Sequence, residues 1–368
     1  MKRGPWWPPD PLPCGAVKRP VIVLIVNAVA YACGDSREPA ADAGSAALSI
    51  SASLGDGVTS DASDDGASND DDVVLDVGAD GAGSADDGGS GEGCKKVDFL
   101  FVIDNSGSMS DEQDALISSF PGFIQTIQAT LTEAQDYHVL VADTDEAWGG
   151  ECPLLCGFFG GTCPDIPNYP CDTGPPSACD TTLGAGVNFP LGSDATNQLC
   201  AFTSGRRFMD ATQPDLSAAF QCAAKVGSDG DGNEKAMSAL VGALSDELAQ
   251  PGGCNEAFVR DDAILVVTFI TDEEDNGSTG VPEGWYANVI ASKKGDQSAI
   301  VMLGLINDLD VPAPLCPAES DDAVKLRTFV DMFPNHIRGS VCEPNYNGFF
   351  EQAVALIDQT CDDFTPAG

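Results

Sequence analysis

The fold of this chain is decided by the stretch VDFLFVIDNSGS at residues 97–108. Its first seven residues are apolar except for Asp98, a composition typical of a buried strand in a parallel sheet. The Asp, Asn, Ser and Gly residues that follow favour a turn. From Ser110, apolar residues recur at spacings of three and four as far as Leu131, which predicts a helix that packs one face on the sheet.

Strands and helices are predicted to alternate along the chain beyond this stretch. Short apolar runs indicate strands, and apolar residues at helical spacing indicate helices. This alternation favours an α/β fold with a doubly wound, Rossmann-like and mostly parallel sheet. The further strands are expected at 137–142, 264–270 and 299–306, and the further helices at 214–224, 234–248, 283–293, 321–332 and 349–361.

Cysteine usage indicates an oxidising compartment. Of the 14 cysteines, 12 lie at or beyond Cys94, and several crowd into a Cys-, Pro- and Gly-rich stretch without regular periodicity at about 146–203. No CxxC pair occurs and the two histidines are remote from this stretch, so disulfides are expected instead of zinc ligation. The sequence therefore predicts a disulfide-rich insertion above the sheet, and it leaves the pairing open.

Residues 1–33 resemble an export signal. Basic residues precede an apolar run, Val21 to Ala32, that is too short for a conventional membrane-spanning helix. Ala30 and Ala32 suit ordinary signal peptidase, whereas Cys33 directly after them resembles a lipobox and predicts lipidation of that cysteine. We expect a protein of the bacterial cell envelope, an outer-membrane lipoprotein or a periplasmic protein, that meets the membrane by its lipid anchor only. A secreted protein and an uncleaved anchor stay open as alternatives.

The charge of the chain is strongly negative and unevenly spread. Residues 34–93 are acidic and rich in Gly, Ser, Ala and Asp, so we expect a disordered linker and a folded part that begins near Cys94. The whole chain has 58 acidic and 17 basic residues, a formal net charge of -41. Because nucleic-acid binders neutralise phosphates with Lys and Arg, this charge argues against nucleic acid as a partner.

Three polar loops stand where a ligand would bind. In open α/β sheets, ligands bind outside the carboxyl ends of the strands. The strand at 97–103 ends in Asp104-Asn-Ser-Gly-Ser, the strand at 264–270 ends in Thr271-Asp-Glu-Glu-Asp, and a third loop spans 227–234. Two serine hydroxyls and one or two Asp carboxylates would leave Mg²⁺ partly hydrated and incompletely neutralised. Such an ion keeps an open position that attracts a carboxylate from a partner.

Each loop also has a purely structural interpretation. An Asx turn accounts for a lone Asp-x-Ser-x-Ser pattern. The run at 229–234 imitates an EF-hand start, but Glu234 stands where that loop needs Gly and Leu240 where it needs a bidentate Glu, so an acidic helix N-terminus is the simpler explanation. The acidic run at 272–275 is either a second cation site or a solvated loop.

Together the loops resemble the metal-ion-dependent adhesion site of von Willebrand factor type A (VWA) domains, over about residues 97–361. The whole arrangement is similar to VWA-domain lipoproteins of bacterial envelopes. The resemblance implies a sheet of the VWA type and a site for Mg²⁺, or for Mn²⁺ or Ca²⁺. The family's third contributor is a threonine, in place of which this chain offers Ser228. The implied metal ligands are Asp104, Ser106, Ser108, Ser228 and Asp272, with Asp229 and Asp275 as candidates for additional cation contacts.

The function that follows is a metal-dependent binding or adhesion module, not an enzyme, that recognises a protein or a glycan. One alternative is a structural envelope protein whose disulfide-rich insertion makes the contacts. Another is an envelope hydrolase, but only His138 and His336 could act as imidazole bases, and neither a nucleophile elbow nor an HExxH motif occurs. The sequence does not identify the partner, the oligomeric state or the resident cation.

Overall fold

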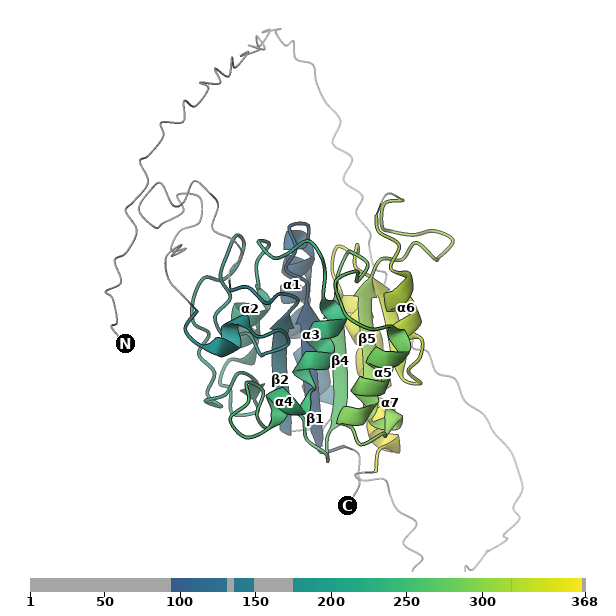
Figure 1. Ribbon diagram of the computed structural model, residues 1–368. Coiled ribbons are helices and arrows are strands. Elements are labelled where there is room, and N and C mark those ends of the chain that lie inside the picture. Colours follow the sequence, from purple (N-terminus) through teal and green to yellow (C-terminus); the bar gives the residue numbers. More distant parts are fainter. Residues whose placement is uncertain (1–93, 131–135, 149–174, 319, 366–368) are drawn as a thin grey trace, which may run out of the picture. The chain divides into compact units, whose positions relative to one another are not determined.

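The architecture was derived from a computed structural model, which describes residues 94–130, 136–148, 175–318 and 320–365 (Figure 1). The predicted export signal, the lipidation at Cys33, the acidic linker and part of the cysteine-rich insertion lie outside the described residues. The expectations for those segments remain predictions.

A six-stranded, mostly parallel sheet organises the described chain, with strand order β3-β2-β1-β4-β5-β6. The central strand β1 pairs in parallel with β2 on one side and β4 on the other. The short edge strand β3 runs antiparallel to β2. The prediction of an α/β fold is confirmed at this level. The strands are β1 (Lys96–Ile103), β2 (Asp136–Asp143), β3 (Met209–Asp210), β4 (Ile264–Ile270), β5 (Ile300–Ile306) and β6 (His336–Ser340).

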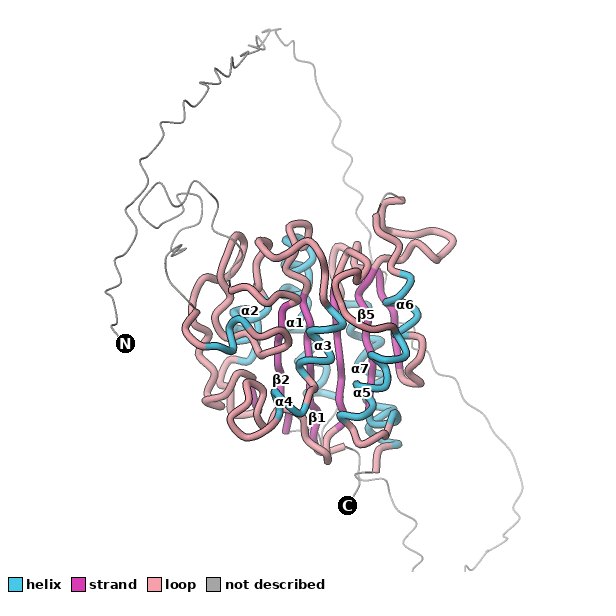
Figure 2. The backbone as a smooth tube through the Cα atoms, in the orientation of Figure 1, coloured by secondary structure: helices cyan, strands magenta, loops and turns pink. Residues whose placement is uncertain are grey.

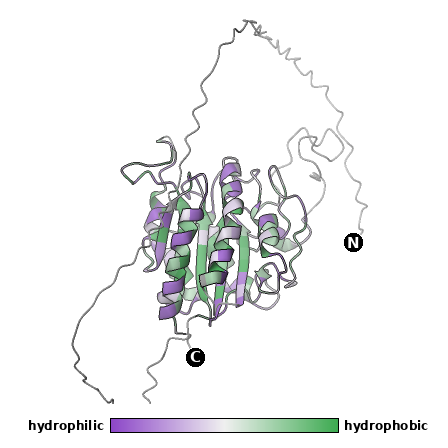
Figure 3. Ribbon diagram, turned by 180° about the vertical axis from the view of Figure 1, so that it is seen from behind, coloured by the Kyte–Doolittle hydropathy of each residue, from purple (hydrophilic) through white to green (hydrophobic). Residues whose placement is uncertain are grey.

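Helices cover both faces of this sheet, because successive side chains of each strand point to opposite faces. In β1, Phe99 and Phe101 enter one core cluster with residues of α1, α2 and α7, whereas Leu100 and Val102 enter a second with α3, α5 and α6 (Figures 1 and 2). Viewed from behind, the strands are apolar and the helices combine polar and apolar residues (Figure 3). The helices are α1 (Ser110–Thr130), α2 (Leu216–Ala224), α3 (Ala236–Ala243), α4 (Asp246–Ala249), α5 (Pro282–Ser292), α6 (Val324–Val330) and α7 (Asn347–Asp363), with short 3-10 turns η2 (Ala178–Thr181) and η3 (Gln297–Ala299).

Two sequence-based expectations about elements are wrong. His336 lies outside every strand expected from the sequence, but it begins β6, which pairs with β5. The single helix expected at 234–248 is two helices, α3 and α4. They separate at Ser245, whose side chain accepts a hydrogen bond from the backbone N–H of Leu248 and so caps α4.

The polar interruption of β1 is explained by a buried ion pair. Asp98 is fully buried, and its carboxylate accepts hydrogen bonds from the backbone N–H and the Nε of Arg260 at 2.7 and 2.8 Å. Burial nevertheless raises the pKa of Asp98 to about 6, because desolvation outweighs the attraction of the guanidinium group. The pair lies at the amino-terminal end of the central strand β1.

The eight described cysteines form four disulfides, so the prediction of disulfides is confirmed for them. Cys94–Cys361 joins the residue before β1 to α7. The other three are Cys179–Cys254, Cys200–Cys222 and Cys316–Cys342. Such bonds are typical of exported proteins in oxidising environments. Among the described helices, none has the length and apolar character needed to span a membrane.

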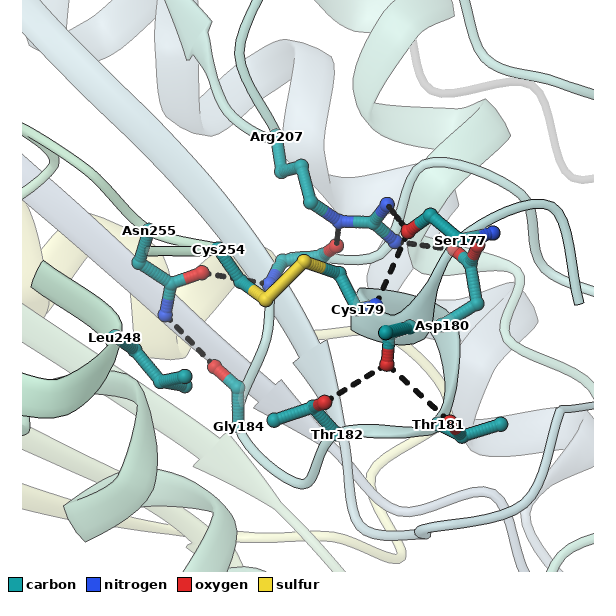
Figure 4. Close-up of a disulfide and its surroundings, with 12 residues drawn as sticks. Ser177, Cys179, Asp180, Thr181, Thr182, Gly184, Arg207, Leu248, Cys254 and Asn255 are labelled. Atoms are coloured by element: carbon teal, nitrogen blue, oxygen red, sulfur yellow. Dashed lines mark hydrogen bonds and ion pairs between the residues drawn. A yellow bond between two sulfur atoms is a disulfide. The ribbon is translucent and has the colours of Figure 1, made fainter. Parts of the chain in front are cut away.

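The described part of the insertion is anchored by one of these disulfides and by buried polar contacts (Figure 4). Arg207 pairs with Asp180, whose side chain is 2% exposed, beside the bond Cys179–Cys254. Asn255 is fully buried; it accepts a hydrogen bond from Gly186 and donates to the carbonyl groups of Gly184 and Ala243. The insertion is therefore held against α3 by satisfied hydrogen bonds.

Candidate functional site

The candidate site lies where the strand order reverses, between β1 and β4. β2 follows β1 on one side of the sheet, whereas β4 lies on its other side, which makes the gap at their carboxyl ends a switch point. The backbone N–H of Asp104 donates to the carbonyl of Ile270 at 3.1 Å and so continues the ladder past the last paired residues. Asp104 and Thr271 therefore face each other at the rim.

Four of the predicted ligands are brought together at this rim. Asp104 is fully buried; its Oδ1 accepts from the backbone N–H of Ser106 at 2.7 Å and its Oδ2 from the Thr271 hydroxyl at 2.6 Å. The hydroxyl oxygens of Ser106 and Ser108 lie 3.4 Å apart. The Ser108 hydroxyl in turn donates to Oδ1 of Asp272 at 3.0 Å. The loops after β1 and β4 thus form one connected polar cluster.

The third loop is held against the first by its backbone. The N–H of Gly230 donates to the carbonyl of Asn105 at 2.8 Å, and a Cβ atom at Gly230 would lie only 2.4 Å from Oδ1 of Asn105. Only glycine permits this approach. The buried side chain of Gln113 donates to the carbonyls of Asp104 and Gly227 and accepts from the N–H of Gly227. Helix α1 therefore holds both loops together.

Three of the predicted contact residues turn to other partners. The Ser228 hydroxyl donates to Oδ2 of Asp194 at 2.8 Å. Oδ2 of Asp229 accepts from the backbone N–H of Ser193 at 2.5 Å. Asp275 is buried and accepts from the backbone N–H of Met237 in the first turn of α3, at 2.7 Å. Hydrogen bonds that hold loops and a helix terminus therefore occupy these side chains.

Glu234, whose sequence position indicates only a mismatch to an EF-hand loop, lies close to Asp104. It is 1% exposed, and its Oε2 lies 3.0 Å from the Thr144 hydroxyl. Its Oε1 has no hydrogen-bond partner among the described residues. Burial, followed by the charge of Asp104, raises the pKa of Glu234 well above its usual range. Its only sequence signal was its place at the end of the third loop.

Negative charge accumulates around these loops. Burial, and after it the charge of Asp104, raises the pKa of Asp272 above its usual range, although the hydrogen bond from Ser108 opposes the shift. Burial and the charges of Asp272 and Asp104 raise the pKa of Glu273 in the same way. Each of these carboxylates would be stabilised by a cation placed between them.

The donor set fits a hydrated divalent cation. Two carboxylates and two hydroxyl groups are hard oxygen donors of the kind that Mg²⁺ and Ca²⁺ prefer. Among the described residues, no three His, Cys, Asp or Glu side chains are already placed to hold a metal ion. The candidate site differs from such clusters because half of its donors are serine hydroxyls.

A separate cavity of about 710 Å³ lies along β6 and contains none of the predicted ligands. Arg338, one of its lining residues, forms ion pairs with Asp310 and Asp331 at 2.8 and 3.1 Å. These pairs neutralise the positive charge of Arg338. The polar cluster at the ends of β1 and β4 therefore remains the better candidate for a functional site.

Comparison with known proteins adds little to this geometry. No family model matches the chain, and no curated protein matches it. Among solved structures, it is similar to proximal thread matrix protein 1 from the mussel byssus, with 11% sequence identity and a TM-score of 0.35. The similarity covers 72% of this chain and 49% of that one, so this chain spans about half the length of the byssus protein. A likeness at this level carries no argument about function.

Proposed function

We propose that this protein is a metal-dependent binding module of the VWA type, with a cation site formed by Asp104, Ser106, Ser108 and Asp272. The single observation that carries the proposal is the connected cluster at the switch point. There the Thr271 hydroxyl joins β4 to Asp104, and Ser108 joins the β1 loop to Asp272. The resemblance to the metal-ion-dependent adhesion site supplies the same four positions.

The chemistry of the cluster suits binding. Mg²⁺ binds through few protein carboxylates and keeps several waters, and Mn²⁺ or Ca²⁺ can use the same oxygen donors. When bound, the cation would present an open coordination position to a partner. Asp104 would contribute a carboxylate already oriented by Ser106 and Thr271, so little side-chain entropy would be lost on binding. The partner would be a protein or a glycan that supplies an oxygen atom.

The proposed setting is the outside of the cytoplasmic membrane, with the module tethered through a lipid at Cys33 and the acidic linker. The four disulfides support an oxidising environment, and the lipid and linker rest on the sequence alone. A structural role for the disulfide-rich insertion is the second candidate. It is supported by the fixation of that insertion to α3 through Asn255.

The positions of the two histidines give a hydrolase less support than a binding module. His138 pairs with Asp98 and His336 with Met302 in the sheet register, near the starts of β2 and β6. Nδ1 of His138 lies 2.9 Å from the carbonyl of Phe258, and burial lowers the pKa of the imidazole. Neither ring reaches the carboxyl ends of the strands where the polar cluster lies.

Calorimetric titration of the folded domain with Mg²⁺ and Mn²⁺ tests the proposal. We expect saturable binding to the wild type and none to Asp104→Ala. The matched control is Asp261→Ala, which removes an exposed aspartate that pairs with Lys294; it should bind as the wild type does. Circular dichroism would verify that all three proteins are folded. Absence of binding to the wild type, or equal binding to Asp104→Ala, would overturn the proposal.

A further inference from the structure

The strand β6 is the last strand of the described sheet, and one of its two sides has no neighbouring strand. In a parallel pair, alternate residues of a strand direct both backbone groups toward the neighbour. The N–H of Met302 donates to the carbonyl of Asn335, and the N–H of Val341 donates to the carbonyl of Ile306, so the odd-numbered residues of this segment face β5. The even-numbered residues of β6, with Arg338 in the middle, therefore direct their N–H and C=O groups away from the sheet.

The outward backbone groups of β6 are available to a ligand. Among the described residues, the N–H and C=O of Arg338 form no backbone hydrogen bond, and the residue is exposed. The carbonyl of Ser340 accepts from the N–H of Glu343 at 3.3 Å, which ends the free edge where the chain turns toward α7. An unpaired strand edge is a template for a further extended chain.

The cavity of about 710 Å³ described above lies along this edge, and the loop after β5 forms one of its walls. Val311 and Leu315 line it with side chains that are 41% and 55% exposed. The N–H of Leu315 donates to the carboxylate of Asp308 at 2.8 Å, and the disulfide Cys316–Cys342 joins this loop to the segment just after β6. Because the wall is already held in place, little conformational entropy would be lost when a ligand binds.

The charge of the cavity favours one class of occupant. Arg338 pairs with Asp310 and Asp331, whereas no basic side chain among the described residues pairs with Asp308 or Glu343. A second copy of this chain, with its net charge of -41, or the acidic linker of the same chain would bring further negative charge to these carboxylates. The occupant that the charge favours is therefore a basic segment of another protein.

We propose that the free edge of β6 binds an extended, basic segment of a partner protein as an added strand. Backbone hydrogen bonds to the outward groups of β6 would supply affinity, and alternate side chains of the segment would contact the apolar and the acidic residues of the cavity. The cavity contains none of the predicted cation ligands. This surface therefore goes beyond the proposed metal-dependent binding and does not require it.

Fluorescence anisotropy of a labelled hexapeptide of alternating Lys and Val residues tests the proposal. The full protein is titrated in EDTA, which keeps the test independent of the cation site, and at about 0.15 M salt, which screens long-range attraction. We expect saturable binding. The same peptide N-methylated at every residue keeps its charges but cannot donate backbone hydrogen bonds, so it should not bind. No binding of the first peptide would overturn the proposal, and so would equal binding of both, because charge alone would then attract them.

Arg338→Pro and Arg338→Thr are a matched pair of variants. Both lose the ion pairs to Asp310 and Asp331, but only Pro also removes the outward N–H. Pro is tolerated in edge strands where the N–H faces solvent, and circular dichroism would verify that both variants are folded. We expect the Lys–Val peptide to bind Arg338→Pro about fivefold or more weakly than Arg338→Thr, since a backbone hydrogen bond is lost. Equal affinities of the two folded variants would contradict strand addition.

The charge of the partner is tested separately. Glu343→Gln should weaken binding of the Lys–Val peptide by about two- to fivefold, the effect of one exposed ion pair. A hexapeptide of alternating Glu and Val residues has the same backbone and should not bind the wild type. Binding of the Glu–Val peptide as tight as that of the Lys–Val peptide would overturn the assignment of a basic partner.

Discussion

The hydroxyl group of Ser108 donates to Oδ1 of Asp272 at 3.0 Å and joins two loops that lie 164 residues apart in the chain. The bond forms because β1 and β4 are adjacent parallel strands, so their carboxyl ends meet at one edge of the sheet. Ser108 is exposed while Asp104 behind it is buried. The cluster therefore opens toward solvent at Ser108 and is closed below by Asp104.

Ser108→Ala should weaken cation binding with little effect on folding. The substitution removes a hydroxyl ligand and also the group that orients Asp272, and losses of this kind reduce metal affinity by about 10–100-fold. Calorimetry with Mn²⁺ measures the affinity, and thermal unfolding in EDTA measures stability. Ser118→Ala is the matched control, because the Ser118 hydroxyl donates only within α1, to the carbonyl of Ala115. Unchanged Mn²⁺ affinity in Ser108→Ala would show that Ser108 is not a ligand to the cation.

Asp98→Asn should remove part of the pH dependence of stability. The pKa of Asp98 is about 6 in the folded protein and near 3.8 in the unfolded chain. Since the folded pKa is the higher one, the folded state binds the proton more tightly. The contribution of this group to stability is therefore full below about pH 4 and is lost as the pH rises to about 6. A difference of about two pKa units corresponds to about 3 kcal/mol.

Urea denaturation of both proteins between pH 4 and pH 7, in EDTA, checks this prediction. The free energy of unfolding of the wild type should fall, relative to that of Asp98→Asn, by about 3 kcal/mol as the pH rises. Asp262→Asn serves as the control, because that aspartate is half exposed and pairs with Lys96 at the surface. If the free energy of unfolding depended on pH in the same way for the wild type and Asp98→Asn, burial of the Asp98 carboxyl group would not be the cause of the pH dependence.

Asn255→Leu should destabilise the protein strongly, because Leu fills the space and satisfies none of the three hydrogen bonds. The N–H of Gly186 and the carbonyls of Gly184 and Ala243 would be left without partners. Buried unpaired groups of this kind cost about 1–3 kcal/mol each, so we expect a loss of about 3 kcal/mol or more. Thermal and urea unfolding measure the loss. Asn288→Ala, at an exposed position in α5, should change stability by less than about 0.5 kcal/mol. A similar small change in Asn255→Leu would show that the insertion is anchored by other contacts.

The central strands and the amphipathic helices could be predicted because their patterns are local. β1, β4 and β5 are apolar runs buried on both faces, and the predicted bounds of β4 match the observed ones. The strand β6, with the sequence HIRGS, has no such pattern, and its extended backbone is set by pairing with β5. The split between α3 and α4 depends on a single cap at Ser245, which helical periodicity does not reveal.

The candidate site, like the fold, could be predicted only in part from the sequence. The sequence by itself determined the α/β class and placed Asp104, Ser106, Ser108 and Asp272 at strand ends, because hydrophobic periodicity and turn chemistry act over a few residues. Only the tertiary structure decided the direction of the Ser228 hydroxyl, the pairing of the described cysteines and the burial of Glu234 against Asp104. These depend on which distant loops meet at the rim and on how much water they exclude. Both are properties of the packed sheet and are absent from any short segment of the chain.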